Sequence, residues 1–136
     1  MQRSLIFSLI ALIAFSCDFN DQPEPKDQGQ TWNLVGYQEM KDGKLEYTSV
    51  SDSTFSYSLR TDGTFVKKVG KYTVDGTYET MNADNLTHYI FQFNTSNSVL
   101  IHSCEEGMED YFVNSQGELA GTWDSCNGVK LFLDRQ

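Results

Sequence analysis

The side chains that most often carry catalysis are scattered through this 136-residue chain rather than grouped. Its two histidines, His88 and His102, each stand alone inside a run that resembles a β-strand, where a structural role is expected. No Gly-x-Ser-x-Gly elbow presents a serine nucleophile to either of them. No Cys-x-x-Cys or His-x-x-x-His spacing provides the ligand pairs of a zinc site. The pattern predicts no catalytic residue, no metal and no cofactor, and therefore a protein that is not an enzyme.

The most specific chemical signal is Cys17, which follows the basic Arg3 and the uncharged, mainly apolar run 5–16. These are the features of a secretory signal peptide, and the run is too short for an ordinary membrane span. Residues 14–17, Ala-Phe-Ser-Cys, resemble the lipobox of bacterial lipoproteins, in which the cysteine is acylated and becomes the first residue. The resemblance implies a signal peptide over 1–16 and a membrane anchor on Cys17. An ordinary signal peptide or a buried apolar segment is the alternative.

Two cysteines, Cys104 and Cys126, remain once Cys17 is assigned to lipid. An exported protein favours their pairing as a disulfide, which would close a loop of a little over twenty residues. Such a bridge stabilises a fold by about 3 kcal/mol in the chain-entropy model. Two free thiols are the alternative.

Acidic residues outnumber basic ones by 19 to 10, and the net charge is −9. Nucleic-acid phosphates require a basic surface, so this charge argues against nucleic acid as a partner. The densest acids are Glu105, Glu106, Glu109 and Asp110. They are expected on a solvated loop, with contact to a cation or to a basic partner as the alternative.

The chain from 17 to 30 contains both prolines and no hydrophobic periodicity, which predicts a disordered tether after the lipid. The remaining residues, 31–136, are enough for one domain.

The domain is organised around 55–78, where apolar and polar residues alternate and predict strands with one buried face. A three-residue loop over 61–63 would pair Leu59 with Phe65 and keep both buried. A two-residue loop would instead pair Leu59 with Val66 and turn Phe65 outward. We therefore predict the three-residue loop, whose final glycine takes the left-handed conformation at little cost.

Turn signals divide the rest of the domain. Asp-Gly and Asn-Gly pairs predict turns at 41–43, at 75–76 and, as a two-residue hairpin, at 127–128. A kink or bulge is expected at Gly70, within a strand interrupted by Lys67, Lys68 and Lys71. Between the turns, further strands are predicted at 31–40, 44–50, 87–93 (with Tyr89, Phe91 and Phe93 on one face), 99–104, 111–113 and 129–135 (with Val129, Leu131 and Leu133 inward).

These elements amount to eight to ten short strands without an amphipathic helix, joined by connections that read as hairpins. The pattern favours an all-β antiparallel meander that closes into an up-and-down barrel over a Greek-key sandwich, because closure removes both exposed edges. An eight-stranded barrel is just wide enough to be filled by side chains or to hold one small ligand.

Gly-Thr-aromatic units recur at 62–65, 75–78 and 120–123, after a Thr-Trp-Asn-Leu start at 31–34. With the lipoprotein signal and the late cysteine pair, they resemble the lipocalin-like lipoproteins of Bacteroidetes-type bacteria over about residues 31–136. The resemblance implies a lipocalin-like barrel and a binding or interaction protein of the outer membrane, on its periplasmic or cell-surface face, with no defined ligand. Gly29 stands three residues before Trp32 rather than two, which leaves open whether this tryptophan closes the barrel. No helix pattern follows the last strand, which implies a reduced barrel.

Two functions follow as hypotheses. Aromatic side chains make up 13% of the chain and could bind a small apolar or amphipathic ligand in or on the barrel, or simply fill it. The other hypothesis is a protein-interaction module, such as an inhibitor of a secreted hydrolase or an accessory subunit of a surface complex. In that case a disulfide-braced loop between Cys104 and Cys126 would present the four acids to a basic partner.

Overall fold

The computed structural model describes residues 29–96, 99–121 and 123–136; the predicted signal peptide, Cys17 and most of the predicted tether lie outside them. The described residues form nine strands and one short 3-10 helix. Their bounds are β1 (Gln30–Lys41), β2 (Lys44–Ser49), β3 (Phe55–Leu59), β4 (Thr64–Val69), β5 (Tyr72–Ala83), β6 (Leu86–Phe93), β7 (Met108–Val113), β8 (Leu119–Gly121), η1 (Trp123–Cys126) and β9 (Lys130–Arg135).

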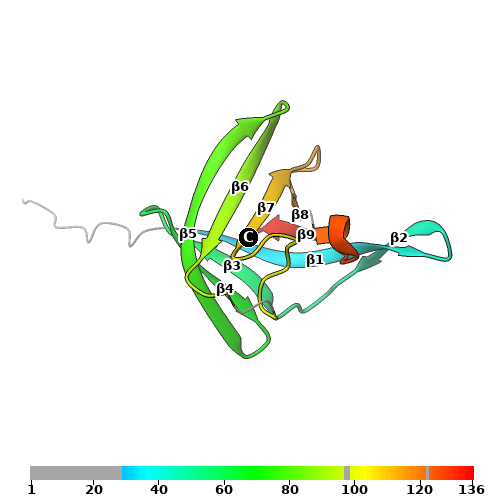
Figure 1. Cartoon of the computed structure of the whole chain (residues 1–136), viewed down its shortest axis with the longest axis horizontal. Helices are drawn as coiled ribbons and strands as arrows, with labels where there is room; N and C mark the ends of the chain where they lie inside the picture. Colours follow the sequence, from blue (N-terminus) through cyan, green and yellow to red (C-terminus); the bar gives the residue numbers. More distant parts are fainter. Residues whose placement is uncertain (1–28, 97–98, 122) are drawn as a thin grey trace, which may run out of the picture.

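The strands form one antiparallel sheet in the order β2-β1-β3-β4-β5-β6-β7-β8-β9, and β1 also pairs with β9 (Figure 1). Eight strands therefore close into a barrel, and β2 is an additional strand that pairs with β1. The predicted lipocalin-like up-and-down barrel is confirmed. The spacing of Gly29 and Trp32 left open whether this tryptophan closes the barrel. Trp32 pairs with Tyr57 on β3 and with Arg135 on β9, and only 4% of its surface is exposed. It lies where the barrel closes.

Because each barrel strand runs against its neighbour, the connections alternate between the two ends of the barrel. One end, the tether end, contains the start of β1, the turns at 60–63, 84–85 and 114–118, and the last residue, whose N–H donates to the Thr31 carbonyl at 2.9 Å. The other, the loop end, contains the turns at 42–43 and 70–71, the segment 50–54, and the described parts of 94–107 and 122–129.

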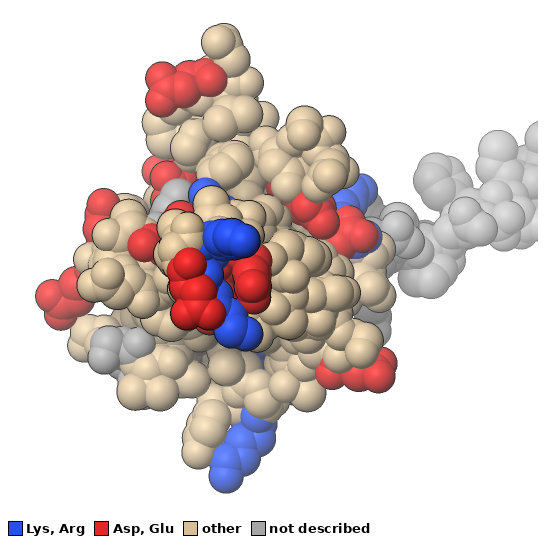
Figure 2. Space-filling view, turned by 90° about the vertical axis from the view of Figure 1, so that its right-hand side faces the viewer, with Lys and Arg blue, Asp and Glu red and all other residues tan. Residues whose placement is uncertain are grey.

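The hairpin of β1 and β2 projects beyond the barrel at the loop end (Figure 1). Figure 2 looks onto this side of the molecule and shows basic and acidic side chains gathered next to one another at its centre. The six residues of β2 are all exposed.

Aromatic rings fill the middle of the barrel. Phe65 and Phe91 are 0% exposed, and their ring centroids lie 5.0 Å apart. The Tyr57 ring lies 4.6 Å from that of Phe91, and Leu133 completes the layer at 0% exposure. The predicted inward faces of 87–93 and 129–135 are confirmed, because their apolar residues lie in this core or pack against it.

The predicted three-residue loop is confirmed by the register of β3 and β4. Leu59 pairs with Phe65, and the Arg60 N–H donates to the Thr64 carbonyl at 2.9 Å. Gly63 has a φ of +82°, a left-handed conformation that a side chain would strain.

The predicted turn at 75–76 is wrong, because both residues lie inside β5. A Cβ on Gly76 would lie 1.9 Å from the Gln92 carbonyl oxygen and 2.9 Å from the Phe65 ring. This glycine therefore lets the Phe65 ring and the backbone of β6 approach β5 closely, and it does not turn the chain.

Other predictions at the loop end also need correction. The strand predicted at 99–104 is irregular backbone. The two-residue hairpin at 127–128 is wrong, because η1 intervenes between β8 and Asn127. Gly70 lies in the turn between Val69 and Tyr72, not at a kink within a strand. At the tether end, Gln30 belongs to β1, one residue earlier than predicted.

Candidate functional site

A lysine and a glutamate meet inside the barrel near its loop end. Lys67 follows Phe65 on the inward face of β4, and Glu109 precedes Tyr111 on the inward face of β7. Lys67 is 0% exposed and Glu109 is 1% exposed, and the lysine Nζ lies 2.5 Å from the carboxylate Oε1. The prediction that Lys67 interrupts its strand is therefore wrong: it continues the strand and faces the core.

The remaining acceptor capacity of Glu109 is used by two further donors. The backbone N–H of His102 donates to Oε1 at 2.5 Å, and the Tyr57 hydroxyl donates to Oε2. The Tyr111 hydroxyl lies 3.3 Å from that of Tyr57. Burial, assisted by the charge of Glu109, raises the pKa of both tyrosines well above the ordinary value, so both remain neutral. A buried carboxylate requires such a complete set of donors.

Aromatic rings surround the lysine. Its Nζ lies 4.8 Å from the centroid of the Phe55 ring, 5.3 Å from that of Tyr57 and 5.4 Å from that of Phe93. Burial lowers the pKa of Lys67, and the neighbouring Glu109 opposes that shift. The ion pair therefore lies in an aromatic surrounding that water does not reach, where its attraction is little screened.

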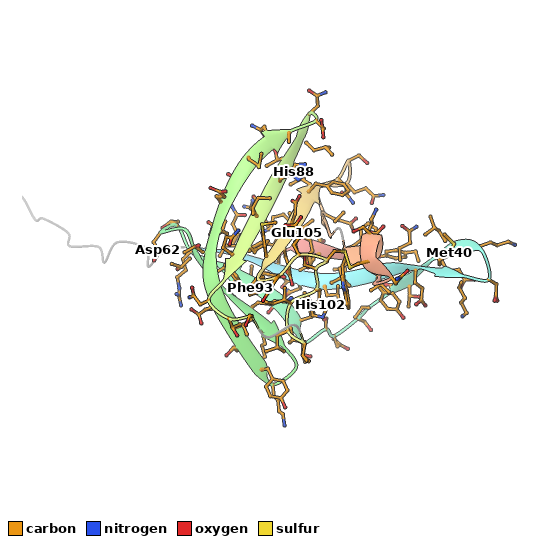
Figure 3. All side chains as sticks on the ribbon, in the orientation of Figure 1. Met40, Asp62, His88, Phe93, His102 and Glu105 are labelled. Carbon is orange, nitrogen blue, oxygen red and sulfur yellow. A yellow bond between two sulfur atoms is a disulfide. The ribbon has the colours of Figure 1, made fainter. Side chains whose placement is uncertain are left out.

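His102 fastens the irregular segment 99–107 onto this ion pair. Its Nδ1 lies 2.7 Å from Lys67 Nζ, and its ring lies 5.0 Å from Phe55 and 4.8 Å from Trp123. Burial, and then the charge of Lys67, lower the pKa of His102 to about 4, so the ring is neutral at pH 7 and Nδ1 accepts from the lysine. Figure 3 shows the labelled His102 and Phe93 in the lower middle of the molecule, with Asp62 at its left.

Because His102 is neutral in the folded protein, we expect the free energy of unfolding to decrease as the pH is lowered. Its pKa is lowered from 6.5 to about 4, so between these values the unfolded chain binds more protons and stability is lost as pH falls. The side chain is 16% exposed, so solvent screening reduces the full linkage energy, and we expect a loss of roughly 2 kcal/mol. Urea unfolding of the protein and of His102→Asn between pH 7 and pH 4 measures this, since the variant lacks the titrating ring. Parallel curves for the two proteins would contradict the assignment.

A cleft of about 410 Å³ opens beside this segment at the loop end. Ile101 and Trp123 provide apolar surface, and Glu105 and Glu106 provide carboxylates. The rest of the lining comes from Ser96, Ser103, Cys104 and Gly107.

The predicted disulfide is present: Cys104 and Cys126 are bonded, with their Cα atoms 5.5 Å apart. It ties the segment 99–107 to η1, whose first residue, Trp123, contacts His102. The bridge therefore braces one wall of the cleft. Cys17, the predicted lipid site, lies outside the described residues.

The four clustered acids do not share one solvated loop. Glu105 and Glu106 are exposed on the cleft, whereas Glu109 is buried with Lys67. Asp110 lies on the outer face of β7, where its carboxylate is 2.9 Å from Nδ1 of His88. The strand histidine His88 thus has a structural partner.

Sequence reasoning missed the cluster of Lys67, Glu109, Tyr57, Tyr111 and His102. The available signal was alternation. Lys67 occupies an inward position between Phe65 and Val69, and Glu109 precedes Tyr111 and Val113 at the same spacing. An inward lysine on one strand requires an inward acid on another, and these two positions satisfy that requirement.

The described residues contain no group of three or more His, Cys, Asp or Glu side chains that could hold a metal ion. Within the same part of the chain, no helix is long and apolar enough to cross a membrane. Lys67 has a lowered pKa but no exposed surface that a substrate could reach.

Fold and site together define a closed, internally packed β-barrel of lipocalin-like architecture, with a cleft at the disulfide-braced end. Comparison with protein-family models, with curated proteins and with solved structures found no match to this chain.

Proposed function

We propose that this protein is a non-enzymatic lipoprotein of the outer membrane, anchored through acylated Cys17, that binds a small amphipathic ligand in the loop-end cleft. The observation that carries the ligand proposal is the cleft itself, in which the Trp123 ring and Ile101 lie beside two carboxylates. The middle of the barrel is occupied by Phe65, Phe91 and Tyr57, so the ligand binds at the mouth and not in the interior.

The lining favours a ligand with an apolar body and a cationic group. An aromatic face attracts an organic cation, and Glu105 and Glu106 add Coulomb attraction at the rim. The net charge of −9 works in the same direction by raising the local concentration of cations. Two lysines of the described structure lie near this end of the barrel, and each is paired with an acid: Lys67 with Glu109 and Lys130 with Asp124.

Calorimetry with two probes of similar shape and opposite charge tests this. The mature, acylated protein in lipid nanodiscs is titrated with 2-phenylethylamine and with 3-phenylpropionate, and empty nanodiscs are the reference. We expect the amine to bind and the acid not to bind. Trp123→Ala should weaken amine binding about tenfold, because it removes the aromatic face. Glu105→Gln should also weaken amine binding, because it removes one of the rim carboxylates. Its matched charge control is Glu39→Gln, on the hairpin away from the cleft lining. Absence of heat with both probes would contradict the cleft as a binding site.

The anchor is tested separately. Cys17→Ser should move the protein from the membrane fraction to the soluble extracytoplasmic fraction, and mass spectrometry of the mature N-terminus should show an acylated cysteine in the parent. An intact thiol at position 17 would contradict the proposal.

One observation supports the alternative function, a protein-interaction module: Glu105 and Glu106 are exposed on a segment braced by a disulfide. A basic protein partner captured at low salt by the parent but not by Glu105→Gln/Glu106→Gln would favour that function over small-ligand binding.

A further inference from the structure

Strand β2 has an edge without a strand partner in the described structure. Every other strand of the sheet pairs on two sides, whereas β2 pairs with β1 alone. It belongs to the hairpin that projects from the barrel, and all six of its residues are exposed (Figure 1). Such an edge is a template for another strand.

The hydrogen-bond pattern shows which backbone groups face outward from this edge. The Val50 N–H donates to the Val35 carbonyl at 2.8 Å, a bond that flanks the Gly36–Ser49 pair. In an antiparallel ladder, this makes Gly36–Ser49 a pair without mutual hydrogen bonds. The N–H and C=O groups of Ser49 therefore point away from β1. Those of Tyr47 and Leu45, at every second position along β2, point the same way.

The outward side chains of the hairpin divide into an apolar and a charged face. Met40 lies opposite Leu45, and they are 65% and 63% exposed, with Tyr47 next on the same face at 52%. The other face carries charges of both signs: Lys41 Nζ lies 3.7 Å from the Glu46 carboxylate, and Lys44 lies opposite Lys41.

We propose that β2 pairs antiparallel with β2 of a second copy of this chain, about a two-fold axis through Leu45. Leu45 then lies opposite Leu45 of the second copy, and their outward N–H and C=O groups bond to one another. The apolar face becomes a row across four strands, Met40–Leu45–Leu45–Met40. On the other face, Lys44 of each copy lies opposite Glu46 of the other.

Charge favours this register over the two neighbouring ones. A two-fold axis perpendicular to the joined sheet pairs residues whose side chains lie on the same face. The possible registers therefore differ in the residue of β2 through which the axis passes. Moving the axis to Lys44 places the two Lys44 side chains opposite each other, and moving it to Glu46 places the two Glu46 side chains opposite each other. With the axis at Leu45, both opposite pairs attract. Self-complementarity of this kind is the property of an interface between two copies.

Charge-reversal variants of the mature protein, purified in a density-matched detergent, test the pairing by sedimentation velocity at low salt. We expect the parent to be in a monomer–dimer equilibrium. Lys44→Glu places acid opposite acid and Glu46→Lys places base opposite base, so each variant alone should dimerise about tenfold more weakly. Mixing the two variants should restore the parent affinity, because each copy then supplies one sign of charge.

Lys68→Glu, at an exposed position on β4, is the matched control and should dimerise as the parent does. A monomeric parent would overturn the proposal. A dimer that persists in both single variants, or two variants that fail to associate when mixed, would overturn it as well. Circular dichroism and the melting temperature confirm that each variant is folded, and none of these outcomes depends on the ligand-binding proposal.

Discussion

Replacement of Lys67 by methionine should lower the free energy of unfolding by about 3–5 kcal/mol. The substitution keeps the approximate volume of the side chain but leaves Glu109 charged, 1% exposed and without its cation. Glu109→Gln should also destabilise strongly, since it leaves the Lys67 ammonium among aromatic rings without a counter-charge. Urea unfolding followed by tryptophan fluorescence at pH 7 measures both losses.

The double variant Lys67→Met/Glu109→Gln is the control that separates charge from packing. The glutamine oxygen can still accept from the His102 N–H, and no buried charge remains. We expect it to be more stable than either single variant, with a coupling energy of at least about 2 kcal/mol. Additive losses would show that the two side chains act independently, contrary to their contact.

Conversion of both disulfide cysteines to serine, Cys104→Ser/Cys126→Ser, should lower stability by about 3 kcal/mol. The bridge spans 22 residues, and its loss frees the unfolded chain to explore more conformations. For a domain of this size the melting temperature should fall by roughly 10 °C.

Dithiothreitol supplies the control for the disulfide prediction. It should shift the melting temperature of the parent to that of the double-serine variant and leave the variant itself unchanged. A parent whose melting temperature is insensitive to complete reduction would contradict a stabilising role for the bridge.

The sequence predicted the parts of this fold that depend on local pattern. Alternation placed Leu59 and Leu133 inward, and the need to bury Phe65 selected the length of the loop that precedes it. Both the disulfide pairing and the closed barrel followed from general expectations: cysteines pair in proteins predicted to be exported, and barrels avoid exposed strand edges.

The features that the sequence did not predict depend on contacts between distant residues. Lys67 looks like a strand breaker until Glu109, 42 residues away, is placed opposite it. The pair Asp75–Gly76 resembles the turn at 62–63, and only the position of the Phe65 ring shows why it stays in a strand. Likewise, the irregular backbone at 99–107 is held by His102 on the ion pair and by the disulfide, neither of which leaves a periodic pattern.

The placement of both ends of the folded domain at the tether end has a practical consequence. The Gln136 N–H is bonded to the Thr31 carbonyl, next to the start of β1, while the cleft and the projecting hairpin lie at the far side of the barrel. A reporter fused after Gln136 would therefore lie at the end of the barrel where β1 begins, and it would leave the opposite end, with the cleft and the hairpin, unobstructed.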